Sequence, residues 1–413
     1  MSKQKIIQYR QAISYLESFS HQKIKDFVSC QNKLTNFYEF LSHFDHPQKK
    51  LNFIHVAGTS GKGSVCSLIQ SGLQNGHNKV GLYTSPHLNT AIERIKINDL
   101  YIDLDSFLKA FRRIKLVIDQ GITPPSYLGL LLTIGFLYWQ EQKCDYVVLE
   151  TGLGGDNDHT NIIPAPLVSV ITNIGLDHQK QLGHSLNSIA QHKAGIIKKG
   201  SVFFTTEKNK NILKLFSRIC LTKKVPLNIV RLTHSSHEQE NLVLAQEVVQ
   251  YLTTKKILKR KNQYLPARQE VIQKKPLIIL DGAHNPDKIK ALISTLQKQK
   301  IRPDYLLVGF SGNKDWQKML RLLVPLTSNL ICTRSLSAPH AAENPQLIAG
   351  YAQKINKQLK IKMFWDNSTA LHYLLQKCQS RQIALITGSL YLIGEIRAHW
   401  LNENYILTKR RSF

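Results

Sequence analysis

Residues 51–74 read LNFIHVAGTSGKGSVCSLIQSGLQ, and this stretch decides the expected fold. The apolar run at 51–56 predicts a buried strand, and the run at 65–74 predicts a helix. Between the two runs lie small and basic residues, namely Gly58, Gly61, Lys62, Gly63 and Ser64. Glycines allow a tight turn whose N–H groups point at one anion, and the following helix N-terminus adds partial positive charge. The stretch therefore predicts a phosphate-binding loop.

The spacing of this loop departs from the usual pattern G-x-x-x-x-G-K-[ST]. Here the first glycine is late, and Gly63 separates Lys62 from Ser64. We expect Lys62 to reach the outer phosphates of a nucleotide and Ser64 to hold Mg²⁺. The alternative is a flexible loop with a chance lysine, which the strand–loop–helix context disfavours.

The composition indicates a cytoplasmic protein with at least two domains. The chain has 413 residues, of which 42% are hydrophobic, enough for real cores. Its six cysteines are scattered without a C-x-x-C pair, which is typical of reduced thiols. The N-terminal residues 1–19 have an amphipathic helix pattern and lack the apolar core of a signal peptide. The longest apolar run, 127–139, is shorter than a membrane span, so we expect a buried helix there and no membrane contact.

The net charge of +27 favours anionic partners. The excess is mostly lysine spread along the whole chain, without the aromatic-interleaved clusters of a nucleic-acid groove. We therefore favour anionic small-molecule ligands over nucleic acid. The basic tail Lys409-Arg410-Arg411 is expected to be a solvated end.

Strand and helix patterns alternate along the chain, which predicts an α/β fold with a mostly parallel sheet in each domain. After a helical region at 1–50, strands are expected at 51–56, 80–83, 145–149, 167–171, 202–205, 277–280, 305–309, 330–333, 360–364 and 383–387. Helices are expected at 65–74, 105–118, 127–142, 187–197, 238–252, 287–298, 316–323, 344–356, 368–378 and 394–400. Residues 206–235 give no clear pattern. The basic stretch 253–263, followed by Pro266, predicts a boundary between domains at 1–265 and 266–413.

Polar residues follow several expected strands, at the edge where α/β sheets bind ligands. Ser85 lies in TSPHL after one strand, and Glu150 follows four apolar residues. We expect Glu150 to hold Mg²⁺ directly or through water; the alternative is a surface or helix-capping glutamate. His178 follows Asp177 after another strand, and alone it is more often a hydrogen-bonded structural histidine.

Lys193 lies in QHKAGIIKKG, a lysine among small and apolar residues. Desolvation lowers a lysine pKa, and a neutral amine reacts with CO₂ to give a carbamate, an anionic metal ligand. In DGAHNP, Asp281 suits a ribose hydroxyl, although it could also cap the next helix, and His284 lies beside it. Arg268 could hold a phosphate or remain a solvated linker charge.

Taken together, these motifs resemble the Mur ligase superfamily, and within it the folylpolyglutamate synthase/dihydrofolate synthase family. The similarity covers nearly the whole chain. It is carried by an ordered set of motifs: IHVAGTSGKGSV, TSPHL, ERIKIND, DYVVLETGLGG, ITNIGLDH, KAGIIKKG, ILDGAHNP and ITGSLYLIGEIR. In the first of them, Ser60 stands where the family usually has asparagine.

The resemblance implies an N-terminal P-loop ATPase domain and a smaller Rossmann-like C-terminal glutamate ligase domain. It also implies an ATP-dependent reaction in which a folate or dihydropteroate carboxylate attacks the γ-phosphate. The resulting acyl phosphate then reacts with the amino group of L-glutamate. Positioning of anions and neutralisation of charge would supply most of the catalysis.

The resemblance also implies roles for individual residues. Lys62, His178 and Lys193 would be catalytic. The ATP site would comprise Gly58, Thr59, Ser60, Gly61, Lys62, Gly63, Ser64, Asn241 near the adenine, Arg268, Asp281 and His284. Of two expected Mg²⁺ sites, one would use Ser64, Ser85 and Glu150, and the other His178 and carbamylated Lys193.

Several positions depart from the family pattern on the acceptor side. The family's G-G-R-L-D-A-T-N is 154–161 here, with Asp156 in place of arginine. A phenylalanine–glutamate pair aligns with Leu128 and Gly129, and a Pro-Arg-Ala motif aligns with Pro339-His340-Ala341. A Mur-type ligase acting on another carboxylate therefore stays open as an alternative, and a basic nucleotide-binding protein that binds nucleic acid is a more distant one. We expect a monomer.

Overall fold

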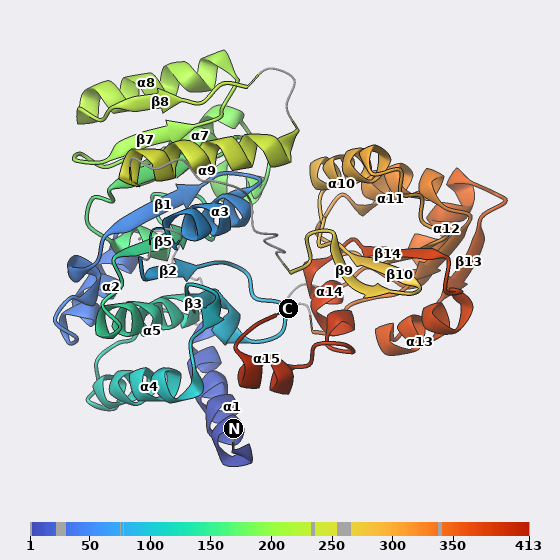
Figure 1. Cartoon of the computed structure of the whole chain (residues 1–413), viewed down its shortest axis with the longest axis horizontal. Helices are drawn as coiled ribbons and strands as arrows, with labels where there is room; N and C mark the ends of the chain where they lie inside the picture. The colour runs from blue at the N-terminus through green and yellow to red at the C-terminus, as the bar shows by residue number, and fades with distance from the viewer. Residues whose placement is uncertain are drawn as a thin grey trace. The chain divides into compact units, whose positions relative to one another are not determined.

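The computed structural model describes residues 2–21, 30–74, 76, 78–232, 236–253, 266–337 and 341–412. The chain divides into two compact units, each built around its own sheet (Figure 1). The N-terminal unit consists of Met1–Gln263 with Leu407–Arg411, and the C-terminal unit consists of Tyr264–Ile406 with Ser412–Phe413. The domain boundary was expected at residue 265, and residues 254–265 lie outside the described residues. Pro339 and His340, which align with the family's Pro-Arg-Ala motif, also lie outside them.

The described N-terminal unit contains an eight-stranded sheet in the order β4-β3-β2-β5-β1-β6-β7-β8. Its strands are β1 (Phe53–Ala57), β2 (Val80–Tyr83), β3 (Ile95–Ile97), β4 (Leu100–Tyr101), β5 (Tyr146–Glu150), β6 (Val168–Ile171), β7 (Val202–Thr205) and β8 (Leu227–Ile229). The central strand β1 pairs in parallel with β5 and β6, whereas β2–β3 and β3–β4 are antiparallel. The prediction of a mostly parallel sheet is confirmed. Parallel pairing places the ends of β1, β5 and β6 at one edge.

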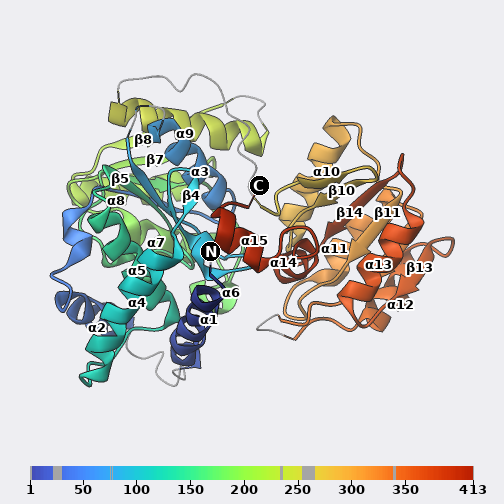
Figure 2. The ribbon, with the colours of Figure 1, turned by 60° about the horizontal axis from the view of Figure 1, so that its bottom comes forward.

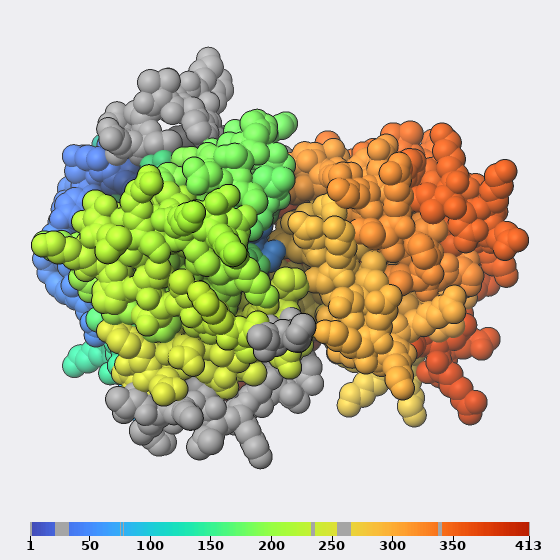
Figure 3. Space-filling model, turned by 90° about the horizontal axis from the view of Figure 1, so that it is seen from above, coloured from blue at the N-terminus to red at the C-terminus, as the bar shows by residue number. Residues whose placement is uncertain are grey.

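Helices cover both faces of this sheet (Figures 1 and 2). They are α1 (Lys3–Glu17), α2 (Cys30–Ser42), α3 (Lys62–Gln74), α4 (Leu104–Asp119), α5 (Tyr127–Glu141), α6 (Gln179–Leu182), α7 (Leu186–Lys193), α8 (Lys210–Lys223) and α9 (His237–Thr253). Because side chains alternate along β1, Ile54 and Val56 pack against α3 and α9, whereas Ala57 faces the core under α7 and α8. Residues of α8 and α9 form an outer face of the unit, yellow-green in Figure 3.

Helix α5 is the buried helix expected from its apolar sequence, since its residues from Gly129 to Trp139 are all buried. Two glycines make room for Trp139, because a Cβ atom at Gly81 or Gly135 would lie 2.7 Å from the indole ring. Trp139 Nε1 donates to the Lys96 carbonyl, which ties α5 to β3. Within the described chain, every helix is too short or too polar to cross a bilayer.

The C-terminal unit contains a six-stranded sheet in the order β13-β12-β11-β14-β10-β9, with β9 antiparallel to the rest. Its strands are β9 (Glu270–Lys274), β10 (Leu277–Leu280), β11 (Tyr305–Val308), β12 (Asn329–Cys332), β13 (Lys360–Met363) and β14 (Ile383–Thr387). Its helices are α10 (Pro286–Lys298), α11 (Trp316–Leu323), α12 (Pro345–Ile355), α13 (Asn367–Lys377) and α14 (Leu390–Arg397). Helix α15 (Glu403–Lys409) begins in this unit, and its residues from Leu407 on belong to the N-terminal unit. Helices α10, α11 and α12 share one core with the sheet.

The structure differs from the elements predicted by the sequence pattern in a few places. Residues 206–235, for which no element was expected, form α8 and β8, and the short strands β3, β4 and β9 were also not expected. The last predicted helix, 394–400, is α14, which begins and ends earlier. The missed strands are two to five residues long, and β9 (EVIQK) is rich in polar residues, so no apolar run marks them.

The basic tail is not a solvated end throughout. The Tyr101 N–H donates to the Arg410 carbonyl at 2.9 Å, and Arg410 Nε donates to the Tyr101 carbonyl at 2.7 Å. The Arg410 guanidinium also reaches the Tyr138 hydroxyl at 3.4 Å. Arg410 therefore pairs with the edge strand β4 at Tyr101, and Leu407–Arg411 belong to the N-terminal unit.

Candidate active site

The predicted phosphate-binding loop connects the end of β1 to the start of α3. Two of its glycines occupy positions that a side chain cannot, with φ of +149° at Gly58 and +80° at Gly61. A Cβ atom at Gly58 would lie 1.9 Å from Thr172 Oγ1, and one at Gly61 would lie 2.5 Å from Asn241 Oδ1. Asn241 on α9, which the resemblance assigns to the ATP site, therefore lies directly against this loop.

Residues that follow β6 hold the loop in place. The Ser60 N–H donates to Asn173 Oδ1 and the Thr59 N–H to the Asn173 carbonyl, both at 2.9 Å. Thr172 Oγ1 donates to the Ser60 carbonyl at 2.6 Å. Thr172 and Asn173 lie in the motif ITNIGLDH, of which only His178 was a predicted site residue. The polar pair directly after an apolar strand was the available signal.

Two lysines converge on the loop. Lys62 Nζ donates to the Gly58 carbonyl at 3.1 Å, and Lys193 Nζ donates to the same carbonyl at 2.9 Å. The Lys193 side chain comes from the end of α7 and is buried. Burial, together with the nearby Lys62 charge, lowers the pKa of Lys193 to about 7. A substantial fraction of this amine is therefore neutral near pH 7, as carbamate formation requires.

Glu150 lies at the carboxyl end of β5 and is only 5% exposed, so it is neither a surface residue nor a helix cap. Its Oε2 atom accepts the Ser85 N–H at 2.9 Å. A Cβ atom at Gly63 would lie 3.4 Å from the same oxygen, so the start of α3, where Ser64 lies, adjoins this carboxylate. The structure thus brings the Ser85 backbone, Glu150 and the first turn of α3 together.

The Glu150 carboxylate suits Mg²⁺, which binds oxygen ligands and keeps waters or phosphate oxygens in its shell. In the part of the chain that the structure describes, no three His, Cys, Asp or Glu side chains gather as a ready-made metal site. An ion held beside Glu150 would therefore take its remaining ligands from hydroxyls, phosphate oxygens and water.

His178 precedes the short helix α6 and has a left-handed backbone conformation, with φ of +49°. Its side chain is 45% exposed, and its Nε2 atom lies 3.9 Å from Asp177 Oδ2. The Asp177 charge acts on Lys193, whose pKa it raises against the larger effect of burial. Asp177, which was not among the predicted site residues, is therefore near enough for its charge to act on Lys193.

Two of the departures on the acceptor side, Asp156 and Gly129, each have a neighbouring histidine in the structure. Asp156 Oδ2 lies 2.8 Å from His192 Nδ1, so its carboxylate faces an imidazole. A Cβ atom at Gly129 would lie 3.1 Å from His159 Cδ2 and 2.8 Å from Pro125 Cβ. The imidazole of His159 therefore occupies the space that a side chain at position 129 would need.

In the C-terminal unit, the loop after β10, which carries Asp281 and His284, lies against the turn before β9, which carries Arg268. The Asp281 oxygens accept the Gln269 N–H at 2.9 Å and the Ala283 N–H at 2.8 Å, and burial raises the pKa of this carboxyl. The Arg268 guanidinium is 3.1 Å from the position of a Cβ atom at Gly282. Asp281 is not the helix cap, because Asn285 accepts the Lys288 N–H and begins α10.

A buried ion pair supports the turn that carries Arg268. Arg397 and Glu270 are 0% and 4% exposed, with 2.9 Å between Arg397 Nη2 and Glu270 Oε1. Glu270 Oε2 also accepts the Ala267 N–H at 2.9 Å. Ala267 and Gln269, on either side of Arg268, have positive φ values of 56° and 45°. The pair therefore holds a turn with an unusual backbone in place.

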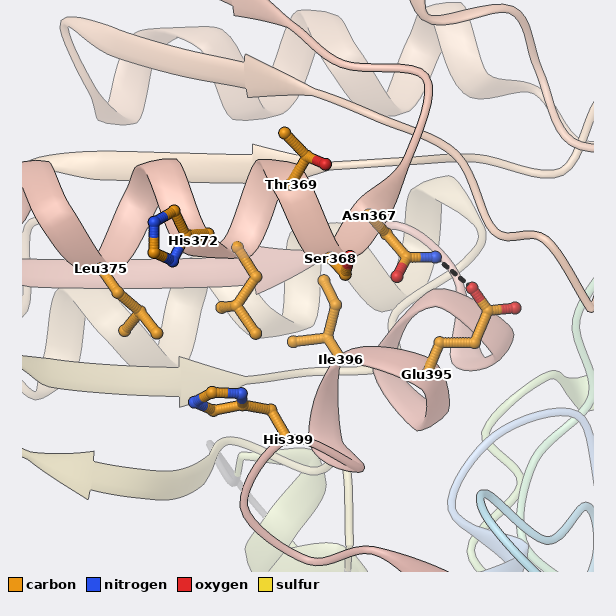
Figure 4. Close-up of a pocket in the computed structure, with 9 residues that line it drawn as sticks. Asn367, Ser368, Thr369, His372, Leu375, Glu395, Ile396 and His399 are labelled. Carbon is orange, nitrogen blue, oxygen red and sulfur yellow. Dashed lines mark hydrogen bonds between the residues drawn. The ribbon is translucent and has the colours of Figure 1, made fainter.

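A separate cavity of about 530 Å³ lies between α13 and α14 (Figure 4). Its lining includes His372, His399 and Glu395. Glu395 accepts hydrogen bonds from Ser335, Ser337 and the Asn367 amide, so its oxygens already have donors. None of the predicted site residues lines this cavity.

Comparison with known proteins agrees with this geometry. Residues 56–259 match the Mur ligase middle domain, and residues 267–390 match the Mur ligase glutamate ligase domain. The chain is 30% identical to the dihydrofolate synthase/folylpolyglutamate synthase of Bacillus subtilis, over 92% of this chain and 97% of that protein. It is 29% identical to the folylpolyglutamate synthase of Lacticaseibacillus casei, over 94% and 98% of the two chains.

A solved structure shares the fold. Mycobacterium tuberculosis folylpolyglutamate synthase complexed with ADP superposes with a TM-score of 0.83 at 22% identity, over 96% of this chain and 99% of that chain. The phosphate-binding loop, the lysines that converge on it and the full-length similarity lead to one conclusion. The chain belongs to the folylpolyglutamate synthase/dihydrofolate synthase family of the Mur ligases, which are ATP-dependent carboxylate–amine ligases.

Proposed function

We propose that this protein joins L-glutamate to the free carboxyl group of dihydropteroate or a folate, with cleavage of ATP to ADP and phosphate. One observation carries the proposal: Lys62 and the buried Lys193 meet at the Gly58 carbonyl of the phosphate loop. In a chain of this family, that arrangement supplies cationic and carbamate-forming groups beside the position of a nucleotide phosphate.

In the proposed reaction, an acceptor carboxylate oxygen attacks the γ-phosphorus of ATP, and the bond to the ADP oxygen breaks. The glutamate nitrogen then attacks the acyl carbon of the acyl phosphate, loses a proton, and phosphate leaves. A carboxylate is a poor acyl donor, so phosphorylation provides the leaving group. The loop N–H groups and Lys62 would hold the phosphates and offset their charge.

Ser64, Ser85 and Glu150 would hold a first Mg²⁺, and His178 with carbamylated Lys193 would hold a second. Bound there, Mg²⁺ would neutralise phosphate charge. The support for the first site is the contact between Glu150, the Ser85 N–H and the start of α3. The support for the second is the lowered pKa of Lys193 together with its burial.

We assign Arg268, Asp281 and His284 to ATP binding. Their support is that the turn of Arg268 lies against the loop that carries Asp281 and His284, and that Asp281 accepts a backbone N–H from each of these two segments. We further propose that the protein acts as a cytoplasmic monomer, for which static light scattering provides the test of oligomeric state.

The proposed acceptor is dihydropteroate or a folate. The Bacillus subtilis relative is named for both activities and the Lacticaseibacillus casei relative for one. The positions that depart from the family pattern, Asp156 and Gly129, motivate an acceptor other than a folate as the alternative. Both have internal partners, His192 and His159, which favours a structural reason for the departures over a changed substrate.

The test is phosphate release from ATP and glutamate with dihydropteroate, tetrahydrofolate and other carboxylates as acceptors. We expect release that depends on glutamate and on dihydropteroate or tetrahydrofolate, with the amide product detected by mass spectrometry. Release only with non-folate acceptors would establish the alternative. The absence of acceptor-stimulated turnover, with a steep salt-dependent affinity for DNA, would favour a nucleic-acid-binding protein instead.

A further inference from the structure

Two segments distant in sequence are joined on both sides of Lys193. Asp156 Oδ2 lies 2.8 Å from His192 Nδ1, and the Asp156 N–H donates to the His192 carbonyl at 2.9 Å. Beyond Lys193, Asn161 Nδ2 donates to the Gly195 carbonyl at 3.4 Å and also to the Asp156 carbonyl at 3.1 Å. Side-chain and backbone bonds therefore tie residues 156–161 to the end of α7.

The backbones of these segments approach each other without space for side chains. A Cβ atom at Gly155 would lie 2.7 Å from the Lys193 carbonyl oxygen. A Cβ atom at Gly195 would lie 2.4 Å from Asp156 Cα. Because both contacts are to backbone atoms, the position of Lys193 Cα depends directly on the position of the 154–156 turn.

The Lys193 side chain reaches from this backbone position to the phosphate loop. Its Nζ atom donates to the Gly58 carbonyl at 2.9 Å, and the residue is only 4% exposed. A displacement of about 1 Å at the end of α7 would break this contact, and a misplacement of that size can cost about a hundredfold in rate.

Both oxygens of Asp156 already have partners within the protein. One faces His192, and the other accepts the Asn157 N–H at 2.8 Å. A carboxylate used in this way is better suited to fixing a turn than to binding a substrate.

We propose that Asp156 and His192 are positioning residues for Lys193. Their hydrogen-bonded pair holds the end of α7 at the distance from which Lys193 reaches the phosphate loop. The role of Lys193 in turnover rests on the proposed function, whereas its placement by the pair does not.

Four variants test this: Asp156→Ala, Asp156→Asn, the exchanged pair Asp156→His with His192→Asp, and the control Asp99→Ala. Asp99 accepts a surface hydrogen bond from Gln74 in the same unit. Two kinds of measurement are made on the full-length protein. One is kcat and the KM for ATP. The other is the rate at which Lys193 is acetylated by a trace pulse of acetic anhydride, read by peptide mass spectrometry against Lys198.

We expect Asp156→Ala to lower kcat about ten- to a hundredfold, with the KM for ATP within about threefold of wild type. Acetylation of Lys193 should rise severalfold, while that of Lys198 should not, because Lys198 is held separately by the carbonyls of Asn161 and Ile163. Asp156→Asn keeps an acceptor for His192 and should stay near wild type. The exchanged pair should recover most of kcat, and Asp99→Ala should match wild type.

The proposal is overturned if Asp156→Ala keeps the wild-type kcat, or if the exchanged pair is as impaired as Asp156→Ala. It is also overturned if acetylation of Lys193 and Lys198 rises together, because the whole segment would then have loosened. If the wild-type protein shows no ligase activity with any acceptor, the proposed function fails. The acetylation measurement would still decide the inference in that case.

Discussion

The phosphate loop and the 154–161 loop lie at the same edge of the N-terminal sheet but relate differently to the family pattern. The first keeps the family motif apart from Ser60, and backbone atoms and small residues make most of its contacts. The second has lost the family arginine and alanine and contains Asp156 and His159 instead. Both are nevertheless held by several hydrogen bonds within the N-terminal unit.

The difference shows why a changed motif must be interpreted with its neighbours in space. Viewed alone, Asp156 reverses a charge beside the expected acceptor site. In the fold, it pairs with His192, and the ring of His159 occupies the space that Gly129 leaves open. The sequence of a loop that is held by backbone contacts has little freedom to change. A loop that is held by side-chain contacts can exchange the contacting residues and keep its shape.

The largest effect is expected from Gly58→Ala in the phosphate loop. The new Cβ atom would lie 1.9 Å from Thr172 Oγ1 and displace the hydroxyl that binds the Ser60 carbonyl. We expect turnover to fall by about a thousandfold or more, with loss of ATP binding measured by calorimetry. An ATP affinity equal to that of wild type would show that this loop tolerates side chains after all.

The next largest effect is expected from Lys193→Ala, which should lower kcat about a hundred- to a thousandfold and leave ATP affinity nearly unchanged. Restoration by added acetate or formate would indicate that the missing group is a carboxylate-like carbamate, whereas restoration by methylamine would indicate a cation. Lys109→Ala is the control, because Lys109 forms an exposed pair with Glu141. A wild-type rate in Lys193→Ala would exclude the lysine from the mechanism.

Whether a feature could be predicted from the sequence depends on how far apart along the chain its residues lie. The phosphate loop and most strands of both sheets were predictable, because apolar periodicity and glycine spacing lie within a few residues. Thr172 and Asn173, which fix the loop, are more than a hundred residues away from it, and no local pattern connects them. The Asp156–His192 pair is likewise a contact between separate segments, so only the fold revealed it.

Acid should affect the 154–161 loop through His159, which is buried against Ser126 and Phe37. Burial lowers the pKa of His159 to about 4, while an unfolded histidine titrates near 6.5. The unfolded chain thus binds the proton first, so stability present above pH 6.5 is lost as the pH falls toward 4. The loss from this residue alone is about 3 kcal/mol.

Urea unfolding at pH 7, 5.5 and 4.5 would measure this loss. His159→Gln should be less stable than wild type at pH 7 but should lose less stability on acidification. His55 is also buried with its pKa lowered, to about 3, and is present in both proteins, so the difference between them isolates His159. Parallel pH dependences for the two proteins would show that His159 does not titrate as expected.

The smallest effect is expected at Gly129, and its sign depends on the neighbouring ring. Alanine is normally favoured over glycine in a helix by roughly 0.5–1 kcal/mol, but here its Cβ atom would lie 2.8 Å from Pro125 Cβ and 3.1 Å from His159 Cδ2. Overpacking of this kind costs about 1–3 kcal/mol, so Gly129→Ala should be destabilising in thermal unfolding. The matched control is Gly350→Ala on α12, which has open space around it and should be stabilising.

Combining Gly129→Ala with His159→Ala tests whether the two positions are coupled. Removing the ring relieves the contact at 3.1 Å and leaves the one with Pro125, so the double variant should be more stable than the sum of the single changes predicts. A coupling of about 0.5 kcal/mol or more would show that position 129 is glycine because position 159 is histidine. If the two stability changes are strictly additive, Gly129 and His159 are independent. In that case Gly129 would again be a candidate for the acceptor site.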